Sequence, residues 1–323
     1  MKRKIAVLLM VAMLFIFGCG GGGEQDQQGV AGSQFAGGDV GLSIGFAEGS
    51  IPSEIFDRDY QFGISLVIKN LGDHDIENGG DVKAKITGID PSDFGVSAND
   101  LEQSPTGGIR GAQKDATGAS VAGETISLDF PTSGASFAYQ KEIAGSIPYN
   151  IKVDVCYKYG TVVNTKLCVL EDILGTTGQQ GLCEINQDKP VDNSGAPVKV
   201  TSFRESVSSS NKVAFVFKIQ HTGGGKVHQL ASDCTSDFQN RDKVHVKIDT
   251  GLSDGLTCSG LQNGQASGSV YEGDATLLNQ AREIRCTQDI NNPTDIEKLV
   301  RIDLTYDYKD SLTQQLMVKH VGG

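Results

Sequence analysis

Cysteine is the residue type in this chain whose number and spacing point most directly to chemistry. Six of the seven cysteines lie beyond residue 150, at Cys156, Cys168, Cys183, Cys234, Cys258 and Cys286. None belongs to a CxxC pair or a Cys/His cluster with the spacing of a structural zinc site. An even number of cysteines is typical of disulfides in an exported chain, so we predict three disulfides and no metal there.

The seventh cysteine, Cys19, follows a basic head and an apolar run. Lys2-Arg3-Lys4, the apolar stretch from Ile5 to Phe17, and Gly18 are the parts of a secretory signal peptide over residues 1–18. The ending Ile16-Phe17-Gly18-Cys19 resembles a lipobox, although Phe17 is larger than the usual residue. We therefore predict lipidation of Cys19, with an ordinary signal cleaved nearby as the alternative. The Gly- and Gln-rich residues 19–38 would then form a flexible tether.

An acidic loop is the best candidate for metal binding. Asp73, Asp75, Glu77 and Asp81 alternate around a Gly-bearing turn and offer the oxygen ligands that calcium takes. The spacing departs from an EF-hand, because glycine comes one position late and Ala84 replaces the bidentate acid. Calcium is therefore a weak candidate beside a solvated turn, and we expect no metal or other cofactor.

The remaining chemical motifs favour structural roles. Gly223-Gly-Gly-Lys226 lacks the spacing of a phosphate-binding loop, which favours a hairpin turn. His221, His228 and His245 are expected at the surface, because no acidic partner can be assigned to them. Four tyrosines at strand spacing are expected in the core with their hydroxyls reaching loops, although such rings also stack on carbohydrate. These four are Tyr157, Tyr159, Tyr306 and Tyr308.

Composition excludes some partners and sets the fold class. The formal net charge is −12, without clustered Lys and Arg, which argues against nucleic acid. Short alternating segments separated by many of the 41 glycines predict an all-β protein. Each half supplies roughly seven short strands with one apolar face, as in antiparallel immunoglobulin-like β-sandwiches.

An internal repeat divides the body in two. The segments 151–169 and 300–318 align without a gap at an offset of 149, and residues 64–69 align with 213–218 at the same offset. A longer loop around Cys234 then displaces Val82–Ile86 from Val244–Ile248. We predict two tandem sandwiches, 39–176 and 181–323.

The repeat also leads to disulfide predictions. We expect residues 151–159 and 165–169 to form a hairpin with its turn at Gly160 to Asn164. Cys156 and Cys168 would then face each other across neighbouring strands. The other four cysteines allow three pairings. Among these we favour Cys258 with Cys286 and Cys183 with Cys234.

Several segments resemble one family. They are Gly41-Leu-Ser-Ile-Gly-Phe46 with Ile51-Pro-Ser-Glu-Ile-Phe56, the run starting Cys156-Tyr-Lys-Tyr, Gly195-Ala-Pro-Val-Lys-Val-Thr201, and His221-Thr-Gly-Gly-Gly225. They are similar to predicted surface proteins of small-genome archaea that carry tandem immunoglobulin-like, adhesion-related domains. The resemblance covers most of residues 41–320 and implies a sandwich fold at the cell surface. It implies no catalytic or binding residue.

These observations favour a non-catalytic protein at the outer face of a membrane. It would be held there through a lipid on Cys19 and would have a structural, adhesion or protein-interaction role. Its partners would be other surface proteins or further copies of itself. A solute- or glycan-binding surface lipoprotein is the alternative, and a hydrolase built from scattered acidic residues comes third.

Overall fold

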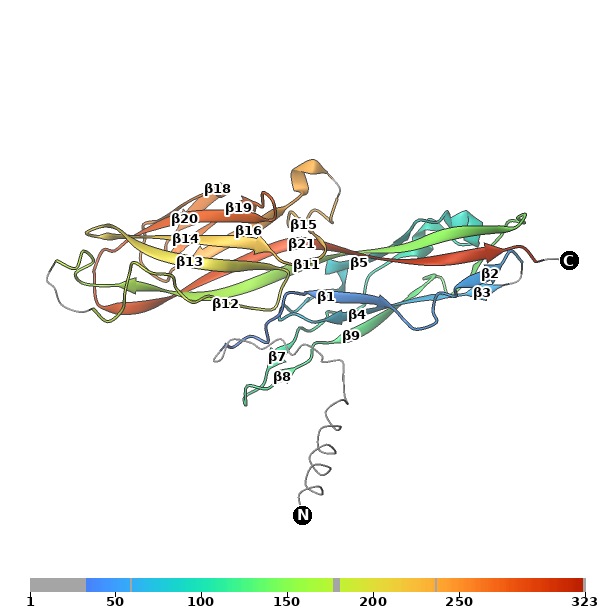
Figure 1. Cartoon of the computed structure of the whole chain (residues 1–323), viewed down its shortest axis with the longest axis horizontal. Helices are drawn as coiled ribbons and strands as arrows, with labels where there is room; N and C mark the ends of the chain where they lie inside the picture. Colours follow the sequence, from blue (N-terminus) through green and yellow to red (C-terminus); the bar gives the residue numbers. More distant parts are fainter. Residues whose placement is uncertain (1–32, 59, 177–180, 236, 322–323) are drawn as a thin grey trace, which may run out of the picture.

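The chain folds into an elongated body of β-strands with two lobes joined by a waist (Figure 1). The computed structural model describes residues 33–58, 60–176, 181–235 and 237–321. The predicted signal peptide, Cys19 and most of the predicted tether lie outside the described residues. The only helical segments in the described part are short 3-10 turns, namely η1 (Gly79–Asp81), η2 (Pro91–Phe94), η3 (Ala98–Leu101) and η4 (Phe238–Asn240).

A ten-stranded sheet runs through both lobes. Its strands are β18 (Gln262–Ser267), β19 (Val270–Thr276), β16 (Lys243–Asp249), β21 (Ile296–Lys319), β11 (Ser146–Val169), β5 (Val82–Thr87) and β6 (Glu102–Gln103), with β2 (Glu54–Phe56), β12 (Asp192–Asn193) and β15 (Lys226–His228) at its margins. The pairing of β2 with β21 is parallel, whereas the other pairings between named strands in the described part are antiparallel.

Smaller sheets complete each lobe. One lobe has β1 (Leu42–Phe46), β4 (Ile64–Asn70) and β9 (Thr125–Phe130), and the other has β13 (Val198–Ser209), β14 (Lys212–His221), β20 (Ala281–Asp289) and β17 (Leu256–Ser259). Two short ribbons pair β3 (Gln61–Phe62) with β10 (Phe137–Ala138) and β7 (Gln113–Lys114) with β8 (Ser120–Val121). The all-β class with antiparallel immunoglobulin-like sandwiches is therefore confirmed.

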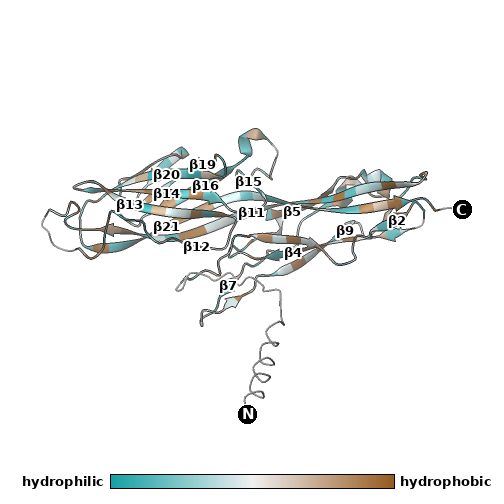
Figure 2. Ribbon diagram, viewed as in Figure 1, coloured by the Kyte–Doolittle hydropathy of each residue, from teal (hydrophilic) through white to brown (hydrophobic). Residues whose placement is uncertain are grey.

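Alternation of apolar and polar residues is the reason that these segments fold as strands. In β14, for example, buried and half-buried residues alternate along the whole strand, as expected where one face of a sheet packs on a core. Figure 2 shows the same alternation of hydrophobic and hydrophilic residues along the ribbons of both lobes. Most buried apolar residues of the two lobes belong to one continuous core, from Leu42 to Val318, and a smaller second cluster lies around Cys168 and Ile185.

The predicted hairpin does not form, because its two halves are one straight strand. β11 continues from Ser146 to Val169 through the expected turn, and β21 likewise runs unbroken from Ile296 to Lys319. The two strands pair antiparallel along all 24 residues of each. Each half of the sequence therefore contributes a strand to both lobes, so the two halves are not separate bodies in space.

The register of β11 and β21 reveals a pseudo-twofold axis at the waist. Lys158 lies opposite Asp307, and Asp307 is also the residue that corresponds to Lys158 at the repeat offset of 149. Tyr157 lies opposite Tyr308 and Tyr159 opposite Tyr306. All four tyrosine side chains are buried beside the axis, as predicted, with ring centroids 5.5 Å apart for Tyr157 and Tyr308. Lobe 1 is therefore built on residues 42–157 and 308–319, and lobe 2 on residues 158–169 and 192–307.

The structure forms three disulfides, which indicates a secreted or extracellular protein. They join Cys156 to Cys234, Cys168 to Cys183, and Cys258 to Cys286. The Cys258–Cys286 prediction is confirmed, because these residues face each other on β17 and β20. The other two predictions are wrong. Cys156 and Cys168 lie on one straight strand, where 12 residues span about 40 Å, so each must find a partner from a neighbouring loop.

One ion pair is buried beside the Cys168–Cys183 disulfide. The Lys189 ammonium lies 3.1 Å from the Glu205 carboxylate, and both side chains are almost fully buried. Glu205 also accepts hydrogen bonds from the Cys168 backbone N–H. Burial outweighs these favourable contacts and raises the pKa of Glu205 to about 7.

This raised pKa predicts a pH-dependent loss of stability. Between about 4.5 and 7 the folded protein keeps a proton that the unfolded chain has released, so the free energy of unfolding should fall as pH rises across this window. In the E205Q variant, the decrease in the free energy of unfolding between pH 5 and pH 7 should be smaller by on the order of 2 kcal/mol. Urea unfolding of both proteins at pH 5 and pH 7 measures the difference. Parallel pH profiles for the two proteins would contradict it.

Candidate functional site

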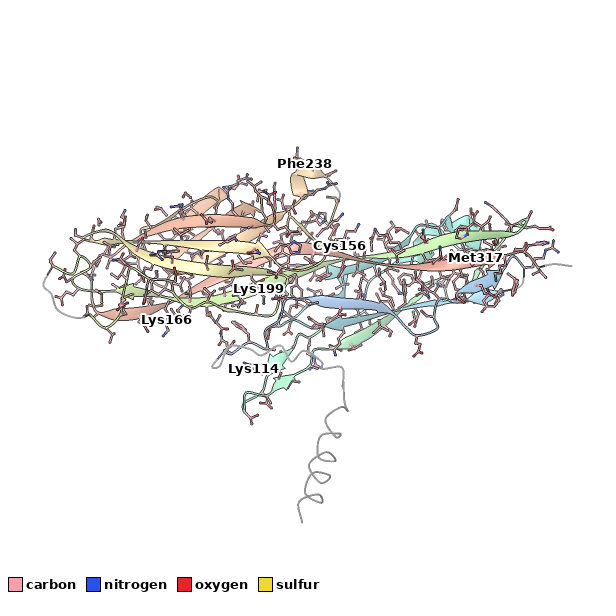
Figure 3. The ribbon with its side chains drawn as sticks, in the orientation of Figure 1. Lys114, Cys156, Lys166, Lys199, Phe238 and Met317 are labelled. Atoms are coloured by element: carbon pink, nitrogen blue, oxygen red, sulfur yellow. A yellow bond between two sulfur atoms is a disulfide. The ribbon has the colours of Figure 1, made fainter. Side chains whose placement is uncertain are left out.

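The most prominent feature outside the two sandwiches is a loop over residues 229–242, between β15 and β16. Figure 3 shows it projecting from the body with Phe238 near its tip, and the Phe238 side chain is 88% exposed. An aromatic ring in water is an unfavourable arrangement unless a partner covers it, and aromatic residues dominate the energetics of protein interfaces.

The base of this loop is fastened to the waist. Cys234 is bonded to Cys156 on β11. The buried Asp307 carboxylate accepts hydrogen bonds from the backbone N–H groups of Ala231, at 3.2 Å, and Ser232, at 2.7 Å. The disulfide and these two hydrogen bonds therefore hold the base of the loop against the waist.

The backbone of the loop is also strained. Four non-glycine residues adopt positive φ, namely Ala231, Asp233, Cys234 and Asp242. Each such residue costs on the order of 1–3 kcal/mol, and strained positions of this kind concentrate at functional sites. The disulfide and the Asp307 carboxylate offset this cost and hold Phe238 away from the body.

A groove of about 660 Å³ lies beside the base of the loop. Its lining is mostly polar and includes Lys152, His221, residues 224–228, Arg241, Asp242, Gln280 and residues 309–311. Gly225 allows the groove wall to approach β21 closely, because a Cβ there would lie 2.5 Å from both the Lys309 carbonyl oxygen and the Tyr308 ring. The Gly225 N–H donates to the Tyr308 hydroxyl at 2.8 Å.

The two histidines of the groove are buried, so the prediction that they lie at the surface is wrong. His221 Nε2 lies 3.0 Å from the Tyr308 hydroxyl. Neither ring nitrogen of His228 makes a hydrogen bond within 3.5 Å, although the Thr235 backbone lies near the ring. Burial is the main cause that lowers the pKa of both residues, so both are neutral at pH 7. His245 lies elsewhere, with Nδ1 3.1 Å from the Asp274 carboxylate.

The predicted acidic loop does not gather its carboxylates. Asp73 accepts hydrogen bonds from the backbone N–H groups of Ala36, Gly37 and Gly195. Asp75 accepts from the Gly111 N–H at 2.7 Å. Asp81 lies next to Asn78, and Glu77 is exposed. Within the described ranges, no group of three or more His, Cys, Asp or Glu side chains is placed to hold a metal ion.

Asp73 instead fastens the end of the predicted tether to the waist. Its carboxylate joins residues 36–37, its own loop and Gly195 at the start of the second repeat. The Ser33 hydroxyl donates to Asp192, and Lys114 donates to the Ser33 carbonyl at 2.7 Å. Residues 33–38 are thus attached to the body, although the sequence predicted a free tether up to residue 38. Lys114 lies on the opposite side of the molecule from Phe238 in Figure 3.

One feature of the sequence indicates the loop, but none indicates the groove. The offset between the repeats grows from 149 to 162 around Cys234, which marks an insertion in the second copy. Nothing in the spacing indicated that Phe238 would be exposed, because its position depends on the disulfide to Cys156.

Comparisons with known proteins give little further information. No protein-family profile matches the chain, and no curated protein matches it in sequence. The collagen-binding domain of the Erysipelothrix rhusiopathiae surface protein RspB aligns with 87% of this chain and 98% of its own. The identity is 10% and the TM-score 0.14, and at that value the alignment carries no argument. Separately, the described residues include no helix with the length and apolarity needed to cross a membrane.

The role of Asp73 can be tested by hydrogen exchange. In the D73A variant the amides of Ala36 and Gly37 should exchange at least about tenfold faster, because two hydrogen bonds to a charged acceptor are lost. The D81A variant, altered in the same acidic loop, should exchange like the wild type. If added calcium slows exchange in the wild type but not in D73A, the carboxylate is a metal ligand and our assignment is wrong.

Proposed function

We propose that this chain is a non-catalytic protein of the outer cell surface, tethered to the membrane through Cys19, that binds a protein partner. The observation that carries the proposal is Phe238, 88% exposed on a strained loop that a disulfide holds in place. A loop of this kind presents one aromatic anchor at low entropic cost, because its conformation is fixed before the partner arrives.

The position of the tether supports an outward-facing role. Residues 33–38 are held at the waist, and they contact Lys114 on the side of the molecule opposite Phe238. A membrane attached through residues 19–32 would therefore lie on the side away from the loop. The loop and the adjoining groove would face the surroundings of the cell.

The proposal that the chain is non-catalytic is supported by what its reactive side chains already do. Six cysteines form disulfides, and His221 pairs with Tyr308. Asp73 and Asp307 bind backbone N–H groups. These groups stabilise the fold.

The partner-binding role predicts a large effect of one side chain. Photo-cross-linking on intact cells of the host should join the wild-type protein to a recurring partner or to further copies of itself. The F238A variant should lose these products by about tenfold or more, as expected for an interface anchor. The matched control L299A removes another exposed side chain, 59% accessible, at the far end of β21, and should cross-link normally. Equal products from F238A and wild type would refute this role of the loop.

The anchor makes a separate prediction. Cells fed a radiolabelled fatty acid should label the wild-type protein and keep it in the membrane fraction. The C19A variant should be unlabelled and released. An unlabelled wild-type protein would exclude the lipid anchor while leaving the role of Phe238 intact.

A further inference from the structure

One stretch of β21 lacks a neighbour on its outer edge. On the side away from β11, β21 pairs with β16 at residues 301–305, with β15 at 307–309, and with β2 at 317–319. No strand in the described part of the chain pairs with residues 310–316 on this side. The Gln314 side chain reaches the Ile51 carbonyl, which leaves Asp310 to Thr313 as an open edge at the groove.

The pseudo-twofold axis provides an internal comparison for this edge. The counterpart of residues 312–313 at the repeat offset is 163–164 on β11, and β12 covers that pair through Val163↔Asn193 and Asn164↔Asp192. Val163 is consequently 0% exposed. Its counterpart Leu312 is only half-buried, although its neighbour on β11, Val153, is fully buried. Leu312 therefore lacks the cover that a further strand would provide.

The first repeat uses the corresponding segment elsewhere. Asn70 and Ile219 correspond at the repeat offset of 149, and they pair with Leu42 and Val200, respectively. Leu42 therefore corresponds to Val200, and by the same spacing residues 34–35 correspond to the β12 residues 192–193. Asp73 holds residues 36–37 at the waist, so this segment does not reach β21. The open edge thus follows from a difference between the two repeats.

The backbone of the open edge is suited to accept a strand. The Met317 N–H donates outward to the Ser53 carbonyl, so the N–H groups of alternate residues, including Ser311 and Thr313, point away from β11. The Ser311 N–H, without a strand opposite, donates to the Asp310 carboxylate at 2.8 Å. Unpaired N–H and C=O groups in a row form a template on which an extended peptide adds as a strand.

The charge around the edge favours an acidic peptide. Lys226 lies directly opposite Lys309 in the sheet, and like charges in that position destabilise the free protein. Asp154 pairs with Lys152 at 2.7 Å and with Lys309 at 3.2 Å. Lys226 makes no ion pair with any described residue. Acidic side chains on an added strand would lie on the face that carries these lysines, in a chain whose net charge is otherwise −12.

We propose that the groove binds an extended acidic peptide from a protein partner, which adds to β21 as a strand along Asp310 to Thr313. The site deepens the proposed partner-binding function and rests on it. The register specifies the sequence pattern of the peptide. A residue opposite Leu312 faces the core and is apolar, whereas residues opposite Ser311 and Thr313 share the lysine-bearing face and are acidic.

Fluorescence anisotropy on the full chain tests the pattern. The probe is a labelled peptide Gly-Asp-Val-Glu-Val-Gly, and a second peptide has the same residues in the order Gly-Val-Val-Asp-Glu-Gly. The alternating peptide should bind at least about tenfold more tightly, because only alternation places both acids on one face of a strand. A third peptide, residues 23–30 of this chain, tests whether the occupant is the tether of a second copy. If that peptide binds more tightly than the alternating peptide, the occupant of the edge is a second copy of this chain and not a foreign partner.

Two pairs of variants locate the binding. T313P removes an outward N–H without touching the β11 ladder and should weaken the alternating peptide about tenfold or more, whereas T313V should bind normally. K226Q should weaken it about threefold and reduce its salt dependence, whereas K69Q, altered on an exposed position of β4, should not. Since K226Q leaves the backbone unchanged, it remains informative even if T313P unfolds. Bound peptide should also slow hydrogen exchange of the Thr313 amide in the wild type.

The outcomes separate this inference from the proposed function. Equal binding of both labelled peptides, or unchanged binding by both T313P and K226Q, would overturn strand addition at this edge. If the F238A cross-linking result holds while no peptide binds, the partner-binding function stands and the acidic strand is wrong.

Discussion

The pairing of β11 with β21 is the constraint on which the rest of the structure depends. The two strands run side by side for 24 residues each, and the rest of the large sheet attaches to them directly or through β16 and β5. Their buried side chains form part of the core of both lobes. Fully burying one Val, Leu, Ile or Phe side chain stabilises the fold by about 1.5–3 kcal/mol. The four tyrosines at the axis fill the waist, where a flexible connection between independent domains would otherwise lie. The lobes therefore form one continuous body.

The sequence could predict the strands but not their partners. Alternation of Ile151, Val153 and Val155 is the same in a hairpin and in a straight strand, so periodicity identified the segment without its path. The choice is made by residues about 160 positions away, where Leu312 and Leu316 lie opposite Val153 and Tyr149. The disulfide predictions followed the hairpin. Only Cys258–Cys286, between neighbouring strands within one lobe, was independent of it.

The candidate site shows the same limit more strongly. An acidic cluster around Asp73 looks like a set of metal ligands in sequence, yet backbone N–H groups from two distant segments occupy that carboxylate. Gly195 is required there because a Cβ would lie 2.3 Å from the Gly37 carbonyl oxygen. Exposure of Phe238 depends on a disulfide that spans 78 residues. The open edge of β21 is recognised only when the two repeats are compared in space, because it follows from a strand pairing that β11 makes with β12 and that β21 lacks in the described part of the chain.

The exchanged strands also impose an order on assembly. Lobe 1 cannot close around its core until residues 308–319 arrive, and its contact between Ile51 and Gln314 joins positions 263 residues apart. Contacts this distant in sequence make folding slow, since loop-closure entropy is lost before the contacts form. A chain synthesised from its N-terminus therefore holds lobe 1 with an unfilled slot beside β11 while lobe 2 is being made. During that interval the slot is an unpaired strand edge, and such edges are where strand exchange between chains begins.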